Sequence, residues 1–351
     1  MSIASSRVDD VAGDPDRPRR HAVYRLAFGV GGTLIVADAF GAAFPFLAAI
    51  LAMMLLANAD RPPRLLQGFI VFLVIVVATT VVNTVSSILV DHPIPFALVV
   101  TLLIFLSFYA HWRGAPPIVT LLAQLAIISV PLYAIISPAA ASALSYVLWE
   151  ASFIAVVVVW IAFAAFPMPA VRPEGPGRVR LEKSAACGHA VTDTIVLLPM
   201  LIWHWTQVPE STSFYTLFVA IMLLREQTDT GRGQLANLHV RAALLGGVAA
   251  VLASMLVVSN GTFLLFAAVV MVFCLWFAAE AVKGGHHGAV MLVAFSTFLI
   301  VFGLGLSEYV STTDYLTTRL GRLFVAILYV VAAMSLVHMF QRRREEAVGV
   351  G

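Results

Sequence analysis

The sequence predicts an all-α, polytopic integral membrane protein with about 12 transmembrane helices. Hydrophobic residues make up 61% of the 351 residues and charged residues only 11%, whereas about a quarter of an average soluble protein is charged. The mean hydropathy is +0.96. Most apolar residues lie in runs close to the ~20 residues that cross a ~30 Å hydrocarbon core. These runs leave no stretch long enough for a separate catalytic domain.

The apolar runs predict six spans in each half of the chain. In the first half they are 23–43, 45–57, 65–86, 95–112, 117–136 and 146–166, and in the second half 184–205, 212–224, 237–258, 262–282, 288–306 and 317–340. We therefore expect an N-terminal arm (1–22), two membrane repeats (23–166 and 184–341), a linker between them (167–183) and a basic tail (342–351). Because six is even, the two repeats share one orientation, which predicts a parallel repeat.

A short apolar run followed by a charged turn occurs twice. Phe46–Ala57 precedes a turn that ends at Arg64, and Phe214–Leu224 precedes one that ends at Arg232, at a constant shift of 168. Trp112-Arg113-Gly114 aligns with Val282-Lys283-Gly284 at a shift of 170. Self-similarity at a fixed period indicates an internal repeat.

The two short runs point to a substrate site. A run of 11 or 12 residues extends roughly 18 Å as a helix, well short of the ~30 Å core. A half-helix ends inside a membrane only where protein or a water-filled cavity satisfies its free backbone groups, and paired short segments mark the sites of many transporters. The alternative is a tilted or locally thinned span without a substrate role.

The distribution of Lys and Arg predicts that both termini are cytoplasmic. With that orientation nearly all basic residues fall on the cytoplasmic side, as the positive-inside rule requires. The exceptions are Arg319 and Arg322, which open the last span on the outer side. The two cysteines, Cys187 and Cys274, lie in apolar segments. We expect no disulfide framework, no metal site and no other cofactor.

Asp193 is the main candidate for proton coupling. It lies inside the seventh span, and His189 precedes it by one helical turn on the same face. Ionisable groups inside spans are costly and are by default candidates for substrate or proton handling. Asp38, in the outer half of the first span, is a third candidate. The alternatives are a carboxylate buried for packing at Asp193 and a solvated outer mouth at Asp38.

Substrate-binding candidates are charged residues at equivalent places in the two halves. Glu150 is expected to open the sixth span, where Arg319 and Arg322 open the twelfth. One acid facing two bases would give a positively biased mouth for an anion. Arg64 and Arg232 coincide across the repeat, although a charged turn that fixes topology explains them equally well. The sequence contains no phosphate-binding Gly loop, nucleophile elbow or zinc-protease helix, so we expect neither an enzyme nor a nucleic-acid partner.

These motifs resemble those of the fusaric-acid-resistance and aromatic-acid-exporter superfamily, in its compact inner-membrane members. The stretch from Tyr24 to Leu34 resembles that superfamily's opening span, and Arg319-Leu-Gly-Arg322 resembles its Arg-x-x-acid motif, with Arg322 where an acid is usual. Val147-Leu-Trp-Glu150 keeps the acid and lacks the arginine. The resemblance implies efflux of aromatic acids across the bacterial inner membrane, with a periplasmic membrane-fusion adaptor. Plant anion channels share the six-span unit, so passive conduction of anions is an alternative mechanism.

The sequence thus leads to a functional hypothesis: a proton-coupled exporter of small, aromatic or other organic anions. Arg319 and Arg322, or Arg64 and Arg232, would attract the carboxylate, and Asp193 with His189 or Asp38 would couple the proton. A major-facilitator transporter is a weaker alternative, because Asp229-Thr-Gly-Arg232 is only a fragment of its loop motif. A non-transporting scaffold of an envelope complex is an alternative from another class, and it predicts no water-accessible cavity at mid-membrane. A membrane enzyme ranks third.

Overall fold

The computed structural model describes ten helices and a few further residues. The described residues are 17–58, 64–167, 180–206, 217, 220, 221, 224, 225, 229–258, 262–305, 329, 332 and 333. Within these ranges the chain forms helices and the turns between them, and no strand. Nine of the described helices are long and apolar enough to cross a membrane. The all-α, multi-pass membrane class is thereby confirmed.

The first half contains six helices, in the order that the apolar runs predict. They are α1 (Arg17–Ala39), α2 (Pro45–Asn58), α3 (Leu65–Leu89), α4 (Pro93–Trp112), α5 (Pro117–Ala134) and α6 (Pro138–Ala165). The largest difference is at α6, which begins well before residue 146. Ser137 caps its first turn by accepting a hydrogen bond from the Ala140 N–H at 3.0 Å, and Pro138 follows at a position where its missing N–H costs nothing.

The second half contributes α7 (Lys183–Thr206), α9 (Asp229–Val258), α10 (Phe263–Ala281) and α11 (Gly285–Gly305). Helix α9 begins at Asp229, so Arg232 lies in a helix and not in a loop as expected. The short run predicted at 212–224 is described only at Leu217, Ala220, Ile221 and Leu224, all helical and buried. Of the last predicted span, only Tyr329, Ala332 and Ala333 are described.

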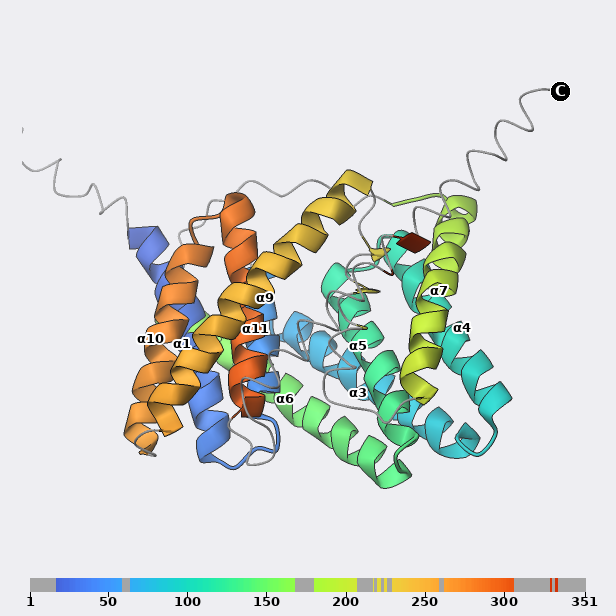
Figure 1. Ribbon diagram of the computed structural model, residues 1–351, viewed down its shortest axis with the longest axis horizontal. Helices are drawn as coiled ribbons and strands as arrows, with labels where there is room; N and C mark the ends of the chain where they lie inside the picture. The colour runs from blue at the N-terminus through green and yellow to red at the C-terminus, as the bar shows by residue number, and fades with distance from the viewer. Residues whose placement is uncertain are drawn as a thin grey trace, which may run out of the picture.

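The helices form two groups, and each group contains a helix from the other half of the chain. In one group, α1 packs against α10, and α10 contacts α9 and α11. In the other group, α7 packs against α4, and α4 contacts α3 and α5 (Figure 1). The Tyr329 hydroxyl donates to the carbonyl of Val196 in α7 at 2.8 Å. Each half of the chain thus places its first described helix, α1 or α7, against a helix of the other half.

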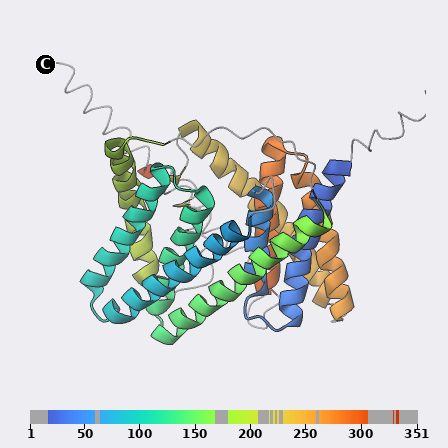
Figure 2. The same cartoon turned by 180° about the vertical axis from the view of Figure 1, so that it is seen from behind.

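Helices α3 and α6 lie side by side and cross the molecule obliquely (Figure 2). Their 25 and 28 residues extend roughly 37 and 42 Å, more than a ~30 Å hydrocarbon core. A helix longer than the hydrocarbon core can fit within it by tilting. Figure 2 shows that α3 and α6 are inclined to α1 and α10. The contact is close at Gly68, because a Cβ there would meet the Trp160 ring at 2.6 Å.

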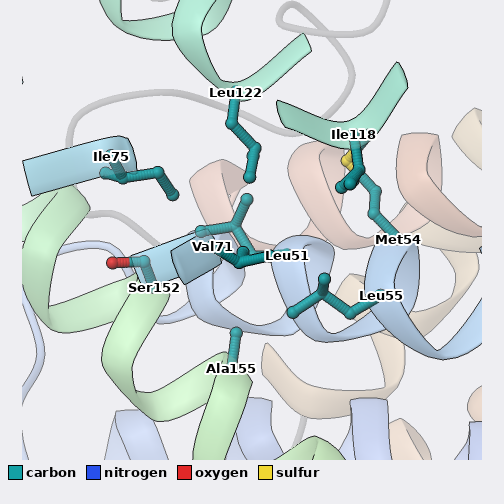
Figure 3. A pocket seen from close by; sticks show the side chains of 9 residues that line it. All are labelled: Leu51, Met54, Leu55, Val71, Ile75, Ile118, Leu122, Ser152 and Ala155. Atoms are coloured by element: carbon teal, nitrogen blue, oxygen red, sulfur yellow. The ribbon is translucent and has the colours of Figure 1, made fainter. Parts of the chain in front are cut away.

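The short helix α2 lies at the centre, in contact with α1, α6 and α11. Its 14 residues extend roughly 21 Å, and Ala49 and Ala52 are completely buried. A pocket beside it has room for about one water molecule. Figure 3 shows its lining, which is aliphatic apart from Ser152: Leu51, Met54, Leu55, Val71, Ile75, Ile118, Leu122, Ser152 and Ala155. Where the structure describes α2, its surroundings are apolar and not a wet passage.

Candidate functional site at the α4–α5 turn

Polar side chains gather where α4 ends and α5 begins. The chain turns at Gly114, whose φ of +83° falls in the left-handed region that favours glycine. The segment leading into α7 is held against this turn by two hydrogen bonds. The Leu181 N–H donates to the Trp112 carbonyl at 3.2 Å, and Arg113 Nη1 donates to the Leu181 carbonyl at 3.0 Å. The first turn of α7 is thereby fixed beside the end of α4.

Asp193 lies deep in α7 and receives a hydrogen bond from α4. Its side chain is 1% exposed, and Trp112 Nε1 donates to its Oδ2 at 2.7 Å. An indole N–H is a donor only, so the carboxyl oxygen is necessarily the acceptor. Trp112 is itself buried. Burying a carboxyl group without hydrogen-bond partners would be costly, and this bond offsets part of that cost.

His189 contacts the same indole from one helical turn earlier. Its ring centroid lies 4.9 Å from that of Trp112, and the residue is exposed. The sequence placed His189 and Asp193 on one face of a helix, and both reach Trp112 in the structure. One tryptophan thus joins an exposed imidazole to a buried carboxyl group.

Arg225 provides a positive charge on the other side of the turn. Its Nη1 donates to Gln124 Oε1 at 2.8 Å, and its Nη2 lies 3.0 Å from the Thr120 hydroxyl, the Pro117 carbonyl and His111 Nδ1. A guanidinium only donates, so His111 accepts at Nδ1 and carries its own proton on Nε2. All four partners are therefore neutral.

Burial lowers the pKa of Arg225 to about 10, because a low-dielectric surrounding disfavours the charged form. The guanidinium still carries its charge at neutral pH. Within the described part of the chain no carboxylate forms an ion pair with it. The α4–α5 turn therefore holds a partly buried cation whose hydrogen bonds all go to uncharged groups.

Gln124 is oriented by this arginine. Its Oε1 must face Nη1, since only the oxygen of the amide accepts. Its Nε2 is then left as a donor, and the side chain is 2% exposed. Among the described residues nothing accepts a hydrogen bond from Nε2. A buried donor without an acceptor is unusual in a native fold and calls for an explanation.

The remaining predicted site residues do not join this cluster. Arg64 is exposed just before α3, where its backbone N–H donates to Gln67 Oε1 at 3.1 Å. Asp38 is exposed in the last turn of α1. Glu150 does not open a helix as expected, because α6 begins at Pro138 and places it mid-helix, exposed. The backbone of Arg232 lies in α9.

The predicted meeting of Glu150 with Arg319 and Arg322 lies outside the described residues. At the α10–α11 turn, Glu280 pairs with Lys283, as its spacing suggests, and also lies 2.9 Å from His287 Nε2. No group of potential ligands that could hold a metal ion occurs in the described ranges. The exposed ion pairs there are those of a solvated loop.

Sequence reasoning missed Trp112, His111, Gln124 and Arg225 as site residues. It considered carboxylates inside spans and charges at their ends, and it passed over His111, which lies at the end of the predicted span 95–112. Gln124 is an uncharged polar residue in a span, and Arg225 directly follows one. A polar amide in an apolar helix is itself a signal, because it needs a partner in the bilayer. That signal could have identified Gln124, although not the arginine that contacts it.

Residues 22–162 match a family described as a protein of unknown function, DUF2955. The match covers α1 to α6, which is less than half of the chain, and it ends before α7. No curated protein matches the chain. No solved structure matches it either.

Proposed function

We propose that this chain is a membrane transporter that exports small, aromatic or other organic anions in exchange for protons. The observation that carries the proposal is the position of Asp193. Its carboxyl group is 1% exposed inside a helix long and apolar enough to cross a membrane, and an indole N–H from another such helix holds it. Ionisable groups at such positions commonly mark proton relays and substrate paths.

The proposed architecture is 12 spans in two parallel repeats, and the helix contacts support it. In the first half, α3 contacts α5, α4 contacts α5, and α3 contacts α4. In the second half the corresponding pairs are also in contact: α9 with α11, α10 with α11, and α9 with α10. The contact of α4 with α7 corresponds to that of α10 with α1. A shift of six helices relates each of these contacts to another one, as expected for a pseudo-twofold axis.

The turns give further support. Gly114 and Gly284, 170 residues apart, have φ of +83° and +76°. In both turns the glycine N–H donates three residues back, to His111 and to Ala281 respectively. The family match over 22–162 coincides with the proposed first repeat.

Location and partners follow from the same proposal. The protein would reside in a bacterial inner membrane with both termini in the cytoplasm, and it would belong to the aromatic-acid-exporter superfamily that its motifs resemble. The α4–α5 turn would then lie on the cytoplasmic side, where a substrate for export is loaded. A periplasmic membrane-fusion adaptor would receive the substrate. Basic residues concentrated in the proposed cytoplasmic loops support this orientation.

The proposal is tested by Asp193→Asn, which keeps the shape of the side chain and removes its negative charge. In inside-out vesicles with an imposed proton gradient, we expect the wild type to accumulate benzoate or a related aromatic acid. The variant should lose the dependence of uptake on the gradient. Asp91→Asn makes the same change at an exposed residue between α3 and α4 and should behave as the wild type.

Gradient-dependent transport that persists in Asp193→Asn would remove this residue from the mechanism. A wild type that moves none of a panel of aromatic and aliphatic acids would contradict the transporter itself and favour the scaffold. Purified protein in vesicles makes this test independent of an adaptor.

A further inference from the structure

We propose that Arg225 and Gln124 together form a binding site for the carboxylate of a small aromatic acid at the α4–α5 turn. The ligand class rests on the proposed function, since it is that of the exported anions. The site itself rests on two independent features of the described residues: a partly buried cation with only neutral partners, and a buried amide donor with no acceptor.

The first feature is charge. All the hydrogen bonds that Arg225 makes with the described residues go to neutral groups, two carbonyl-type oxygens, a hydroxyl and an imidazole nitrogen. Neutral acceptors orient a guanidinium and leave its net charge intact. Hydrogen bonds between ionised groups are shorter and stronger than those between neutral groups, and guanidinium with carboxylate is the best-matched pair. An anion is therefore the ligand with most to gain here.

The second feature is the Nε2 of Gln124. The amide cannot rotate by half a turn to satisfy it, because its oxygen would then leave Arg225 Nη1, 2.8 Å away. The unused donor and the guanidinium belong to the same hydrogen-bonded pair, so the proposed ligand is one that accepts from both. A carboxylate has two oxygens and about four lone-pair sites, enough to reach both donors at once.

The surroundings suit an aromatic acid that arrives from one end of the helices. Pro116 and Pro117, in the turn that begins α5, are exposed, whereas Gln124 is buried behind them. The His111 ring contacts both Arg225 and the Trp112 ring, with a ring-centroid distance of 5.3 Å to the latter. Offset or edge-to-face contacts between rings are favourable. A benzoate ring could thus contact His111 while its carboxylate faces the two donors.

The competing role for Arg225 is purely structural. Its hydrogen bonds to Pro117, Thr120 and Gln124 could simply hold its own chain segment against α5, as a clamp. Gln124→Glu separates the two roles. The new carboxylate would pair with Arg225 and keep the clamp, yet it would neutralise the guanidinium and abolish the Nε2 donor. A clamp predicts an unchanged or more stable protein that behaves as the wild type, whereas a binding site predicts a folded protein that no longer binds anions.

The test is equilibrium binding of radiolabelled benzoate to the purified full chain in detergent, in buffer free of other carboxylates. We expect binding to the wild type that unlabelled benzoate displaces and uncharged benzamide does not. Arg225→Gln and Gln124→Glu should each weaken binding at least about tenfold, the scale of one lost hydrogen bond to a charged group. Gln234→Glu, the same charge change at an exposed residue of α9, should bind as the wild type.

Gln124→Glu that binds benzoate as the wild type does would overturn the site, as would a wild type that does not bind benzoate. The result is separable from transport. A wild type that binds benzoate through Arg225 and moves no acid in vesicles would retain the site and lose the proposed function. Vesicles in which Gln124→Glu still exports aromatic acids would retain the function and lose the site.

Discussion

The indole of Trp112 is the contact point between α4 and the titratable residues of α7. Its N–H reaches Asp193 at 2.7 Å, and its ring lies 4.9 Å from that of His189. Neither interaction is local, since 81 residues separate Trp112 from Asp193. The Trp112 side chain therefore links a buried carboxyl group on one span to another span.

Replacing Trp112 by Phe tests the value of that hydrogen bond. The change keeps an aromatic ring and leaves the buried Asp193 without this donor, which should lower the free energy of unfolding by about 1–3 kcal/mol. Thermal unfolding of the purified protein in detergent measures it. Trp203→Phe changes a tryptophan of α7 that is 65% exposed and should leave the melting temperature nearly unchanged. Equal shifts in both variants would mean that the Asp193 bond contributes nothing.

Arg225 shows why a site residue can be invisible in a sequence. Its four partners precede it by 101 to 114 residues. In the sequence the residue is merely the first charge after an apolar run, which is the usual place for a topology signal. Only the packing of its segment against α5 makes the guanidinium part of a cluster.

At the scale of the element, helix ends were the least predictable feature, and capping residues explain the early start of α6. Apolar runs mark where a helix crosses the hydrocarbon and do not mark where its first turn begins. Ser137 and Pro138 form a strong start signal ahead of the apolar run of α6. The earlier start moved Glu150 from the opening of a helix to its middle.

Helices α9 and α11 approach one another closely at Gly246. A Cβ added at Gly246 would lie 2.2 Å from the Ala294 carbonyl oxygen and 2.8 Å from Thr297 Cβ. Because the nearest atom belongs to the backbone, it cannot move away as a side chain would. Small residues at helix contacts in membranes allow this kind of approach.

We therefore expect Gly246→Ala to destabilise the protein by about 1–3 kcal/mol, the usual cost of overpacking. The opposing gain in helix propensity is only about 0.5–1 kcal/mol. Gly32→Ala on α1 is the matched control, since nothing lies within 4 Å of its Cβ position; it should be neutral or slightly stabilising. Melting temperatures that rise in both variants would contradict the close contact of α9 with α11.

At the scale of the whole molecule, the two halves are joined by exchanged contacts. Helix α1 packs against α10, and α7 packs against α4. A Cβ at Gly31 in α1 would lie 3.3 Å from Cys274 Cβ in α10, just below the ~3.5–4.5 Å range for disulfides. The contact between α1 of the first half and α10 of the second half can therefore be tested with an engineered disulfide bond.

Gly31→Cys should form a disulfide with Cys274 under mild oxidation, once the Met271 side chain turns aside. With a protease site inserted in the 167–183 linker, the cleaved halves should remain joined on a gel until a reductant is added. Both native cysteines, Cys187 and Cys274, lie in the second half, so the wild-type halves have no bond to form. Gly32→Cys, which faces open space, should leave them separate. Halves that separate without reductant in Gly31→Cys would contradict the exchange.

The sequence by itself determined the class of the protein, the approximate positions of the ten described helices and the face that His189 shares with Asp193. Composition, run length and helical period are properties of neighbouring residues, so they can be read along the chain. Which helices touch is decided by packing over long sequence separations. Only the tertiary structure could therefore bring Trp112 to Asp193, surround Arg225 with neutral acceptors and seat α1 against α10.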